Sequence, residues 1–278
     1  MPKSALPIPD ASIPDAPVPA AGGAPPEPVG LASSPALSLT SAPALPLTSA
    51  PALPLTSAPA LPLPAAPDCV TPPYWDDACR HLGKRDRVMK KLIPQFGEAR
   101  LQSRGDAFTT LARSIVGQQI SVKAAQSVWN RFVEVVGGPS THLAPASVIA
   151  QDVPALRGAG LSARKAEYLG DLARHFDSGA VHVAQWQQMD DEAIIEELVA
   201  IRGIGRWTAE MFLIFHLMRP NVLPLDDLGL IKGISQGYFS GEPVSRAEAR
   251  EVGEAWAPYR SVATWYIWRS LDPLPVNY

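Results

Sequence analysis

From residue 70 onward the apolar residues recur at the spacing of helices, and no run of alternating apolar and polar residues predicts a strand. One helix is expected after Asp106, with Phe108 and Leu111 on its apolar face, and another after Ser121, ending at Gly137. Further helices are predicted at 162–176, 191–200, 206–218, 227–234, 246–255 and 261–270. We therefore predict an all-α fold, a compact helical array with short connections rich in Gly and Pro.

The first 68 residues follow no such pattern. They contain 18 of the 30 prolines, no aromatic residue and no histidine, and the sequence of residues 41–48 recurs at 49–56 and, less exactly matched, at 57–64. Such Pro/Ala/Leu repeats favour extended chain without backbone hydrogen bonds. We predict a disordered tail over 1–68 and one domain over 69–278. Two questions stay open: whether the prolines dock a partner, and whether the tail is translated.

The number of cysteines and the lack of long apolar runs exclude several classes of protein. Cys69 and Cys79 are the only cysteines, too few for a disulfide-rich scaffold, an all-cysteine zinc site or a four-cysteine iron–sulfur cluster. With no apolar run of membrane-spanning length and no secretory signal, we expect a cytoplasmic protein without membrane association, nucleoid-associated if bacterial.

The net charge of −3 belongs to the tail, so the predicted domain is neutral overall. Within it, residues 80–131 carry eleven basic residues against Asp86, Glu98 and Asp106. This local excess either faces phosphate or forms a solvated face balanced by the acidic residues of 190–197.

The most informative segment is Leu198 to Met211, where Gly203 and Gly205 separate two helical patterns. This spacing predicts a tight hairpin, with Ala209 small enough for the helices to cross closely. The free N–H groups at the start of the second helix then suit a DNA phosphate without reading sequence. An ordinary helix end followed by a packing glycine is the alternative.

The whole pattern resembles the helix-hairpin-helix DNA glycosylase superfamily, and the resemblance runs from residue 115 to 268. Upstream, Ile115-Val-Gly-Gln-Gln-Ile-Ser121 is similar to the family's minor-groove wedge loop. Downstream, Pro224-Leu-Asp-Asp-Leu-Gly229 resembles the segment with the catalytic aspartate. The end of the chain, residues 256–268, resembles the last helix of the alkyl-purine branch, DNA-3-methyladenine glycosylase II.

The resemblance implies a role for each matched residue. Asp227 is expected to be catalytic, with Asp226 as its competitor, and both carboxylates also suit a helix N-cap. Gln119 is expected to fill the gap left by a flipped nucleotide, and amide capping of helix ends is the alternative for this glutamine and its neighbour. The remaining expected DNA contacts are Gln118, Gly203, Gly205, Arg206 and Thr208, and the expected base pocket is Trp207, Met211 and Trp268.

The resemblance also implies the reaction. Relatives that cut the DNA backbone carry a lysine where this chain has Trp207, so we expect a monofunctional glycosylase that leaves an abasic site. Trp207 and Trp268 favour a cationic alkylated purine through cation–π stacking, a good leaving group that needs no general acid. The expected partner is double-stranded DNA with alkylated bases, bound by a monomer. We expect no required cofactor or metal; a structural monovalent cation at the hairpin is a family implication. The alternatives are a non-catalytic damaged-DNA-binding module and a glycosylase for a neutral deaminated or oxidised purine.

Overall fold

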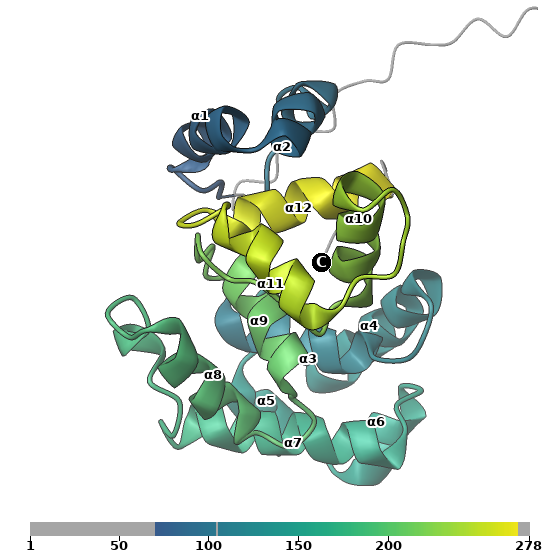
Figure 1. The fold of residues 1–278 in the computed structure, drawn as a ribbon. Coiled ribbons are helices and arrows are strands. Elements are labelled where there is room, and N and C mark those ends of the chain that lie inside the picture. Colours follow the sequence, from purple (N-terminus) through teal and green to yellow (C-terminus); the bar gives the residue numbers. More distant parts are fainter. Residues whose placement is uncertain (1–69, 104, 272–278) are drawn as a thin grey trace, which may run out of the picture. The chain divides into compact units, whose positions relative to one another are not determined.

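The computed structural model describes residues 70–103 and 105–271, which fall in one compact unit built of helices (Figure 1). Besides the helices, these residues form an isolated β-bridge between Val70 and Ser103. The all-α prediction is confirmed for the described part of the chain, and the predicted tail lies outside it. The helices are α1 (Trp75–Arg85), α2 (Arg87–Leu92), α3 (Ala107–Gly117), α4 (Val122–Val136), α5 (Pro145–Ile149), α6 (Val153–Gly158), α7 (Ala163–Asp177), α8 (Asp191–Val199), α9 (Arg206–Phe215), α10 (Leu228–Tyr238), α11 (Arg246–Glu254) and α12 (Arg260–Leu271), with 3₁₀ turns at Ile93–Phe96 and Val183–Gln185.

Local sequence signals set the ends of the helices that carry the site. The side chain of Asp106 accepts a hydrogen bond from the Thr109 N–H at the start of α3, and that of Ser121 accepts one from the Ala124 N–H at the start of α4. Helix α4 ends at Gly137, whose φ of +73° lies in the region that favours glycine. These caps occur where the sequence predicts them.

Two predicted boundaries are wrong. The helix predicted at 206–218 ends at Phe215, and Met218 adopts a φ of +52°. Pro220 accounts for part of this difference, because proline disfavours helical backbone at the residue before it. The helix predicted at 227–234 continues to Tyr238. Helix α1 and the short helices α2, α5 and α6 were not placed by the sequence pattern.

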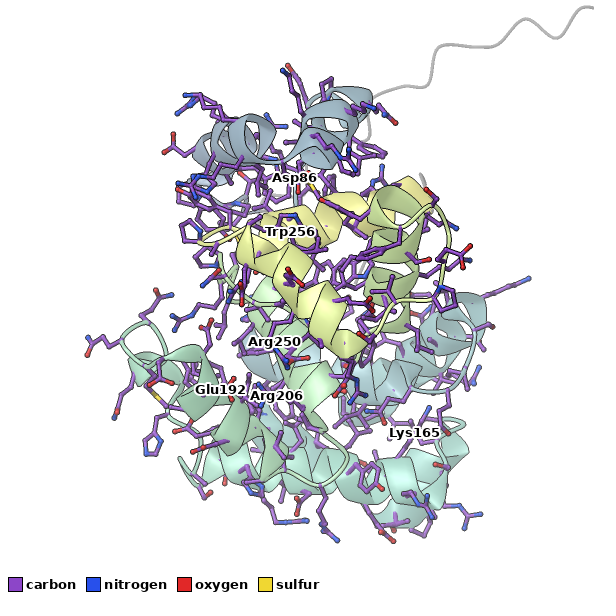
Figure 2. The ribbon with its side chains drawn as sticks, viewed as in Figure 1. Asp86, Lys165, Glu192, Arg206, Arg250 and Trp256 are labelled. Carbon is purple, nitrogen blue, oxygen red and sulfur yellow. The ribbon has the colours of Figure 1, made fainter. Side chains whose placement is uncertain are left out.

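Helices from the two ends of the described chain pack together. Helices α1 and α2 contact α12, although more than 160 residues separate α2 from α12 (Figure 1). Helix α12 also contacts α10. Asp86 helps to join them: its carboxylate caps α2 and accepts hydrogen bonds from the Tyr238 hydroxyl at 2.7 Å and the Trp256 indole at 3.1 Å (Figure 2). This buried carboxylate is thus fully engaged by donors from three segments.

The central helices form the rest of the core. Helix α3 packs on α4, α7 and α9, and α8 packs on α9. In α9 the residues Thr208–Ile214 are buried without interruption, as are Ser261–Ile267 in α12. Three hydrogen bonds of Ser261 join the segment after α9 to α12. Its N–H donates to the Pro220 carbonyl, its hydroxyl donates to the Arg219 carbonyl, and the same hydroxyl accepts from the Val222 N–H. They fix the path of the chain that delivers Asp227.

Candidate active site

Asp227 is the N-cap of α10, and donors from three segments hold its carboxylate. Oδ1 accepts hydrogen bonds from the Leu230 N–H at 2.6 Å and from the Trp268 indole N–H at 2.8 Å. Oδ2 accepts one from the Trp207 indole N–H at 2.9 Å. The two indoles come from α9 and α12, so the carboxylate sits where three helices meet. Charge-assisted hydrogen bonds to both oxygens fix its orientation.

The two indoles differ in how closely other residues pack against them. Trp268 stacks on Phe215, with ring centroids 5.6 Å apart and an interplanar angle of 12°. A Cβ added at Gly229 would lie 3.0 Å from Asp227 Oδ1 and 3.3 Å from Trp268 Cδ1. A side chain at position 229 would therefore crowd both partners of the hydrogen bond between Trp268 and Asp227. Trp207, in contrast, is 39% exposed.

The neighbouring carboxylate of Asp226 has a different partner. It is exposed, and its Oδ1 pairs with the Arg246 guanidinium on α11 at 2.6 Å. The two adjacent aspartates therefore divide their tasks: Asp226 ties the loop to α11, and Asp227 faces the indoles. Asp227 both caps α10 and lies beside two aromatic side chains. Its role as a helix N-cap is therefore compatible with the expected catalytic role.

Met211, the third residue expected in the base pocket, is buried in the core of α9 with 7% of its surface exposed. The structure brings Trp207 and Trp268 together at Asp227 and leaves Met211 largely covered by protein. Its role in a base pocket stays a prediction.

The hairpin between α8 and α9 has the expected tight turn. Gly203 adopts a φ of +90°, and a Cβ there would lie 2.2 Å from the ring of Tyr168. Gly205 has an extended backbone and would meet no protein atom within 4 Å, so packing requires glycine only at the first position. Gly205 is the N-cap of α9 and offers no side chain to its first N–H groups. Thr208 is buried, and its expected contact with DNA stays a prediction.

Arg206 begins α9, but its guanidinium is already paired. It contacts Glu192 on α8 at 2.5 Å and Glu210 one turn along α9 at 3.1 Å (Figure 2). Hydrogen bonding to Glu192 is the main reason that the pKa of Arg206 is raised above its ordinary value. At this helix end the first backbone N–H groups have no side-chain cap, whereas carboxylates already engage three of the five N–H donors of the guanidinium. The predicted DNA contact of Arg206 stays a prediction.

The turn between α3 and α4 places its two glutamines differently. The side chain of Gln118 donates to the Gly203 carbonyl at 2.9 Å, which ties this turn to the hairpin. Gln119 is exposed and has a φ of +58°, a conformation that costs a residue with a Cβ about 1 kcal/mol. A strained, exposed side chain at the tip of the turn fits the predicted wedge; the contact of Gln118 is with protein.

Sequence reasoning missed three polar residues that organise the site: Lys165 on α7, Glu210 on α9 and Arg246 on α11. Glu210 is 5% exposed and its Oε2 has no hydrogen-bond partner. Burial raises the pKa of its carboxyl to about 7, against the opposing effect of Arg206. A glutamate within an otherwise buried helical run was the sequence signal for this residue; the other two resemble ordinary surface charges.

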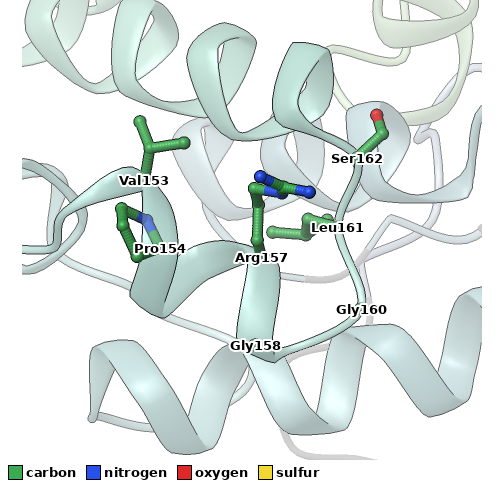
Figure 3. A pocket seen from close by; sticks show the side chains of 7 residues that line it. All are labelled: Val153, Pro154, Arg157, Gly158, Gly160, Leu161 and Ser162. Atoms are coloured by element: carbon green, nitrogen blue, oxygen red, sulfur yellow. The ribbon is translucent and has the colours of Figure 1, made fainter.

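Other features of the described residues lie outside this site. An open pocket of about 730 Å³ is lined by α6 and by residues 160–162, which precede α7 (Figure 3), and none of its lining residues is a predicted site residue. In the basic stretch, Arg80 and Arg100 pair with Asp77 and Asp76, so part of the positive charge is balanced locally. Among the described residues no group of three or more His, Cys, Asp or Glu could hold a metal ion. None of the helices described is long and apolar enough to cross a membrane.

Comparison with known proteins finds the same family at this site. Residues 112–258 match the model of the HhH-GPD superfamily of base excision DNA repair proteins. The chain is 31% identical over 194 residues to DNA-3-methyladenine glycosylase 1 of Schizosaccharomyces pombe, covering 68% of this chain and 85% of that protein.

Two solved structures are similar over most of their length. The DNA-3-methyladenine glycosidase of Bacillus halodurans is 33% identical with a TM-score of 0.63, covering 73% of this chain and 92% of that one. The 3-methyladenine DNA glycosylase of S. pombe in complex with abasic DNA is 30% identical with a TM-score of 0.62, covering 72% of this chain and 100% of that one.

Proposed function

This chain belongs to the HhH-GPD superfamily of base excision DNA repair proteins, and we propose that it is a monofunctional glycosylase for alkylated purines in double-stranded DNA. Its reaction is hydrolysis of the bond between base and deoxyribose. The base leaves with the electron pair of that bond, water adds to the sugar carbon and loses a proton to solvent, and an abasic site remains. Relatives named DNA-3-methyladenine glycosylase support this substrate class.

The observation that carries the proposal is the Asp227 carboxylate, held by Trp207 and Trp268 beside an exposed indole face. Oδ1 accepts two hydrogen bonds and Oδ2 accepts one, so Oδ2 keeps a lone pair for substrate or water. As the base departs, positive charge develops on the sugar. A fixed carboxylate stabilises that charge without having to reorient, and Oδ2 can orient the attacking water.

Trp207 decides between hydrolysis and lyase chemistry. In lyase-type relatives an amine at this position attacks the sugar carbon, and an indole has no such nucleophile. Its N–H is instead directed at Asp227. The exposed part of its ring is available to stack on a base, and a cationic purine gains about 0.5–2 kcal/mol from such stacking that a neutral purine lacks. This difference supports an alkylated purine over a neutral one.

DNA is held by two elements. The uncapped N–H groups that follow Gly205 face a backbone phosphate, and Gln119 enters the space that the flipped nucleotide leaves. All of these groups lie in one chain, so a monomer is sufficient.

A monovalent cation at the hairpin is compatible with its carbonyl groups. The carbonyls of Ile201 and Gly203 each accept one hydrogen bond, from the Ile204 N–H and the Gln118 amide respectively, and a carbonyl oxygen has two lone pairs. When bound there, the cation adds positive charge beside the phosphate.

The test is base release from radiolabelled methylated duplex DNA incubated with purified protein. We expect 3-methyladenine to appear in the soluble fraction faster than hypoxanthine from a matched duplex. We also expect the strand to stay intact until hot alkali is added, and borohydride to trap no protein–DNA adduct. Strand cleavage without alkali, or a trapped adduct, contradicts the monofunctional reaction.

Faster release of hypoxanthine leaves a glycosylase but replaces its substrate with a neutral purine. Binding to damaged duplex with no base released from either DNA would support the non-catalytic module instead.

A further inference from the structure

One face of α7 contacts both of the elements expected to touch DNA. Lys165, Tyr168 and Asp171 follow one another at intervals of three residues, so they lie on the same side of the helix. Lys165 contacts the turn between α3 and α4, and Tyr168 and Asp171 contact the hairpin between α8 and α9. The two loops are thus supported by a single rigid element.

The contact of Lys165 is with backbone carbonyls. Its ammonium donates to the Val116 carbonyl at 2.8 Å and to the Gln118 carbonyl at 2.7 Å, at the C-terminal end of α3 (Figure 2 shows Lys165 on α7). The last carbonyls of a helix lack intrahelical hydrogen-bond donors and carry partial negative charge. An ammonium group here donates hydrogen bonds to them and also interacts favourably with that charge. Partial burial lowers the pKa of Lys165, in keeping with an ammonium group withdrawn from water.

The contacts with the hairpin are equally specific. The Tyr168 ring occupies the space that a Cβ of Gly203 would need. Asp171 accepts a hydrogen bond from the Arg202 N–H at 3.0 Å and one from its guanidinium at 3.1 Å. The Gln118 amide joins turn and hairpin directly through the Gly203 carbonyl. The turn therefore has two supports, Lys165 and Gln118.

The strain at Gln119 explains why these supports matter. A non-glycine residue stays at positive φ only where its surroundings leave no alternative, and Gln119 directly follows the carbonyl that Lys165 holds. Without the ammonium, the backbone at Gln119 is free to relax toward negative φ. The Gln119 side chain would then point elsewhere while the hairpin keeps its place.

We propose that Lys165 is a positioning residue, which holds the Gln119 turn in register with the hairpin so that both engage one damaged duplex together. The proposal rests on the proposed function, because it takes DNA as the ligand and Gln119 as the inserted side chain. Lys165 acts through the backbone of the turn and does not itself contact the reacting atoms.

The experiment compares Lys165→Met, Lys165→Arg and wild type on two duplexes, one undamaged and one with a stable abasic-site analogue. The dissociation constants of both are measured, and the fluorescence of 2-aminopurine beside the analogue reports unstacking. Arg250→Met on α11 is the control for loss of one exposed positive charge. Circular dichroism checks that each variant is folded.

We expect Lys165→Met to lose roughly tenfold or more of the preference for the abasic duplex, because hydrogen bonds from a charged donor are lost. Affinity for undamaged duplex should stay within about twofold of wild type, since the phosphate site of the hairpin is unchanged. The fluorescence increase should fall in parallel. Lys165→Arg, which keeps charged donors, should recover part of both signals, and Arg250→Met should match wild type.

An unchanged preference in folded Lys165→Met overturns the proposal, and so does an equal loss on both duplexes, which indicates a general charge effect. If Lys165→Met does not fold, Gln118→Leu removes the other support and must reduce the preference in the same direction. Neither readout requires base release. A wild-type protein that prefers abasic duplex yet releases no base would overturn the proposed function and leave this inference standing.

Discussion

Asp227 and Asp226 are neighbours in sequence whose partners predict different consequences of the same substitution. Asp227→Asn keeps the shape of the side chain but loses the charge that we propose stabilises the sugar. We expect base release at saturating enzyme to fall by about 100-fold or more, while the dissociation constant for abasic duplex changes less than about threefold. Asp226→Asn breaks an exposed pair with Arg246 and should retain release within about threefold. If Asp226→Asn is the inactive variant, our assignment within the pair is wrong.

The indole of Trp207 has two properties that a single substitution separates. Trp207→Phe keeps an aromatic ring for stacking and removes the N–H that holds Asp227 Oδ2. We expect the single-turnover rate constant to fall by roughly tenfold, with little change in affinity for abasic duplex. Trp129→Phe is the matched control, because the buried Trp129 N–H has no partner to lose. A wild-type rate in Trp207→Phe would leave stacking as the whole role of this side chain.

Glu210 gives the stability of the folded protein a defined dependence on pH. Its carboxyl has a pKa of about 7 in the folded state, above the unfolded value of about 4.3. The protonated Glu210 carboxyl therefore stabilises the folded state at low pH, and this contribution is lost as the pH rises through about 7. Glu210→Gln removes this dependence, so from about pH 5 to pH 8 its unfolding free energy should gain about 1–3 kcal/mol relative to wild type. Urea unfolding at the two pH values measures it.

Glu192 is the matched control for the sign of this effect. The pKa of its carboxyl is lowered by the hydrogen bonds of Arg206, so its stabilising contribution is present at neutral pH and lost on acidification. Glu192→Gln should therefore become less destabilising as the pH falls. The same trend with pH in both glutamine variants would contradict these assignments.

At the scale of elements, the sequence predicted the features that depend only on residues close together in the chain, such as helix N-caps. Asp106 and Ser121 occupy the N-cap positions expected of them. The sequence did not predict the partners of Arg206 or Lys165, because the first depends on how α8 crosses α9 and the second on how α7 meets the end of α3. A charged residue at a helix start has the same pattern whether it contacts phosphate or carboxylate.

The hairpin element offers a prediction in which each of its two glycines controls for the other. Gly203→Ala places a Cβ against the Tyr168 ring at a positive φ, so we expect a loss of about 1–3 kcal/mol in unfolding free energy. Gly205→Ala meets no protein atom and should change stability by less than about 1 kcal/mol. If the start of α9 binds phosphate, Gly205→Ala should still weaken duplex binding, because its methyl group enters the DNA side. Urea unfolding and duplex titration distinguish the two effects.

At the scale of the whole molecule, the sequence predicted the fold class but not how the expected site residues come together. Asp227, Trp207 and Trp268 lie in separate motifs, and the sequence predicts a catalytic role for the first and base stacking for the other two. Their mutual hydrogen bonds span 20 and 41 residues, and helical periodicity carries no information at that range. The packing of α1 and α2 against α12 was likewise unpredicted, since residues 69–105 carry none of the family's motifs.

The contacts that build the site predict that a protein lacking residues 1–68 keeps its activity. The donors to Asp227, the hairpin and the turn with Gln119 all lie between Gln118 and Trp268, and α1 and α2, which support α12, begin at Trp75. We expect the shortened protein to unfold within about 0.5 kcal/mol of the full-length chain and to release base from short duplexes at an equal rate. A longer deletion that removes residues 1–68 and also α1 is the contrasting variant. It should destabilise the fold, because Trp75 and Leu82 are removed from the core. A large loss of activity with α1 still present would assign the first 68 residues a part in DNA binding.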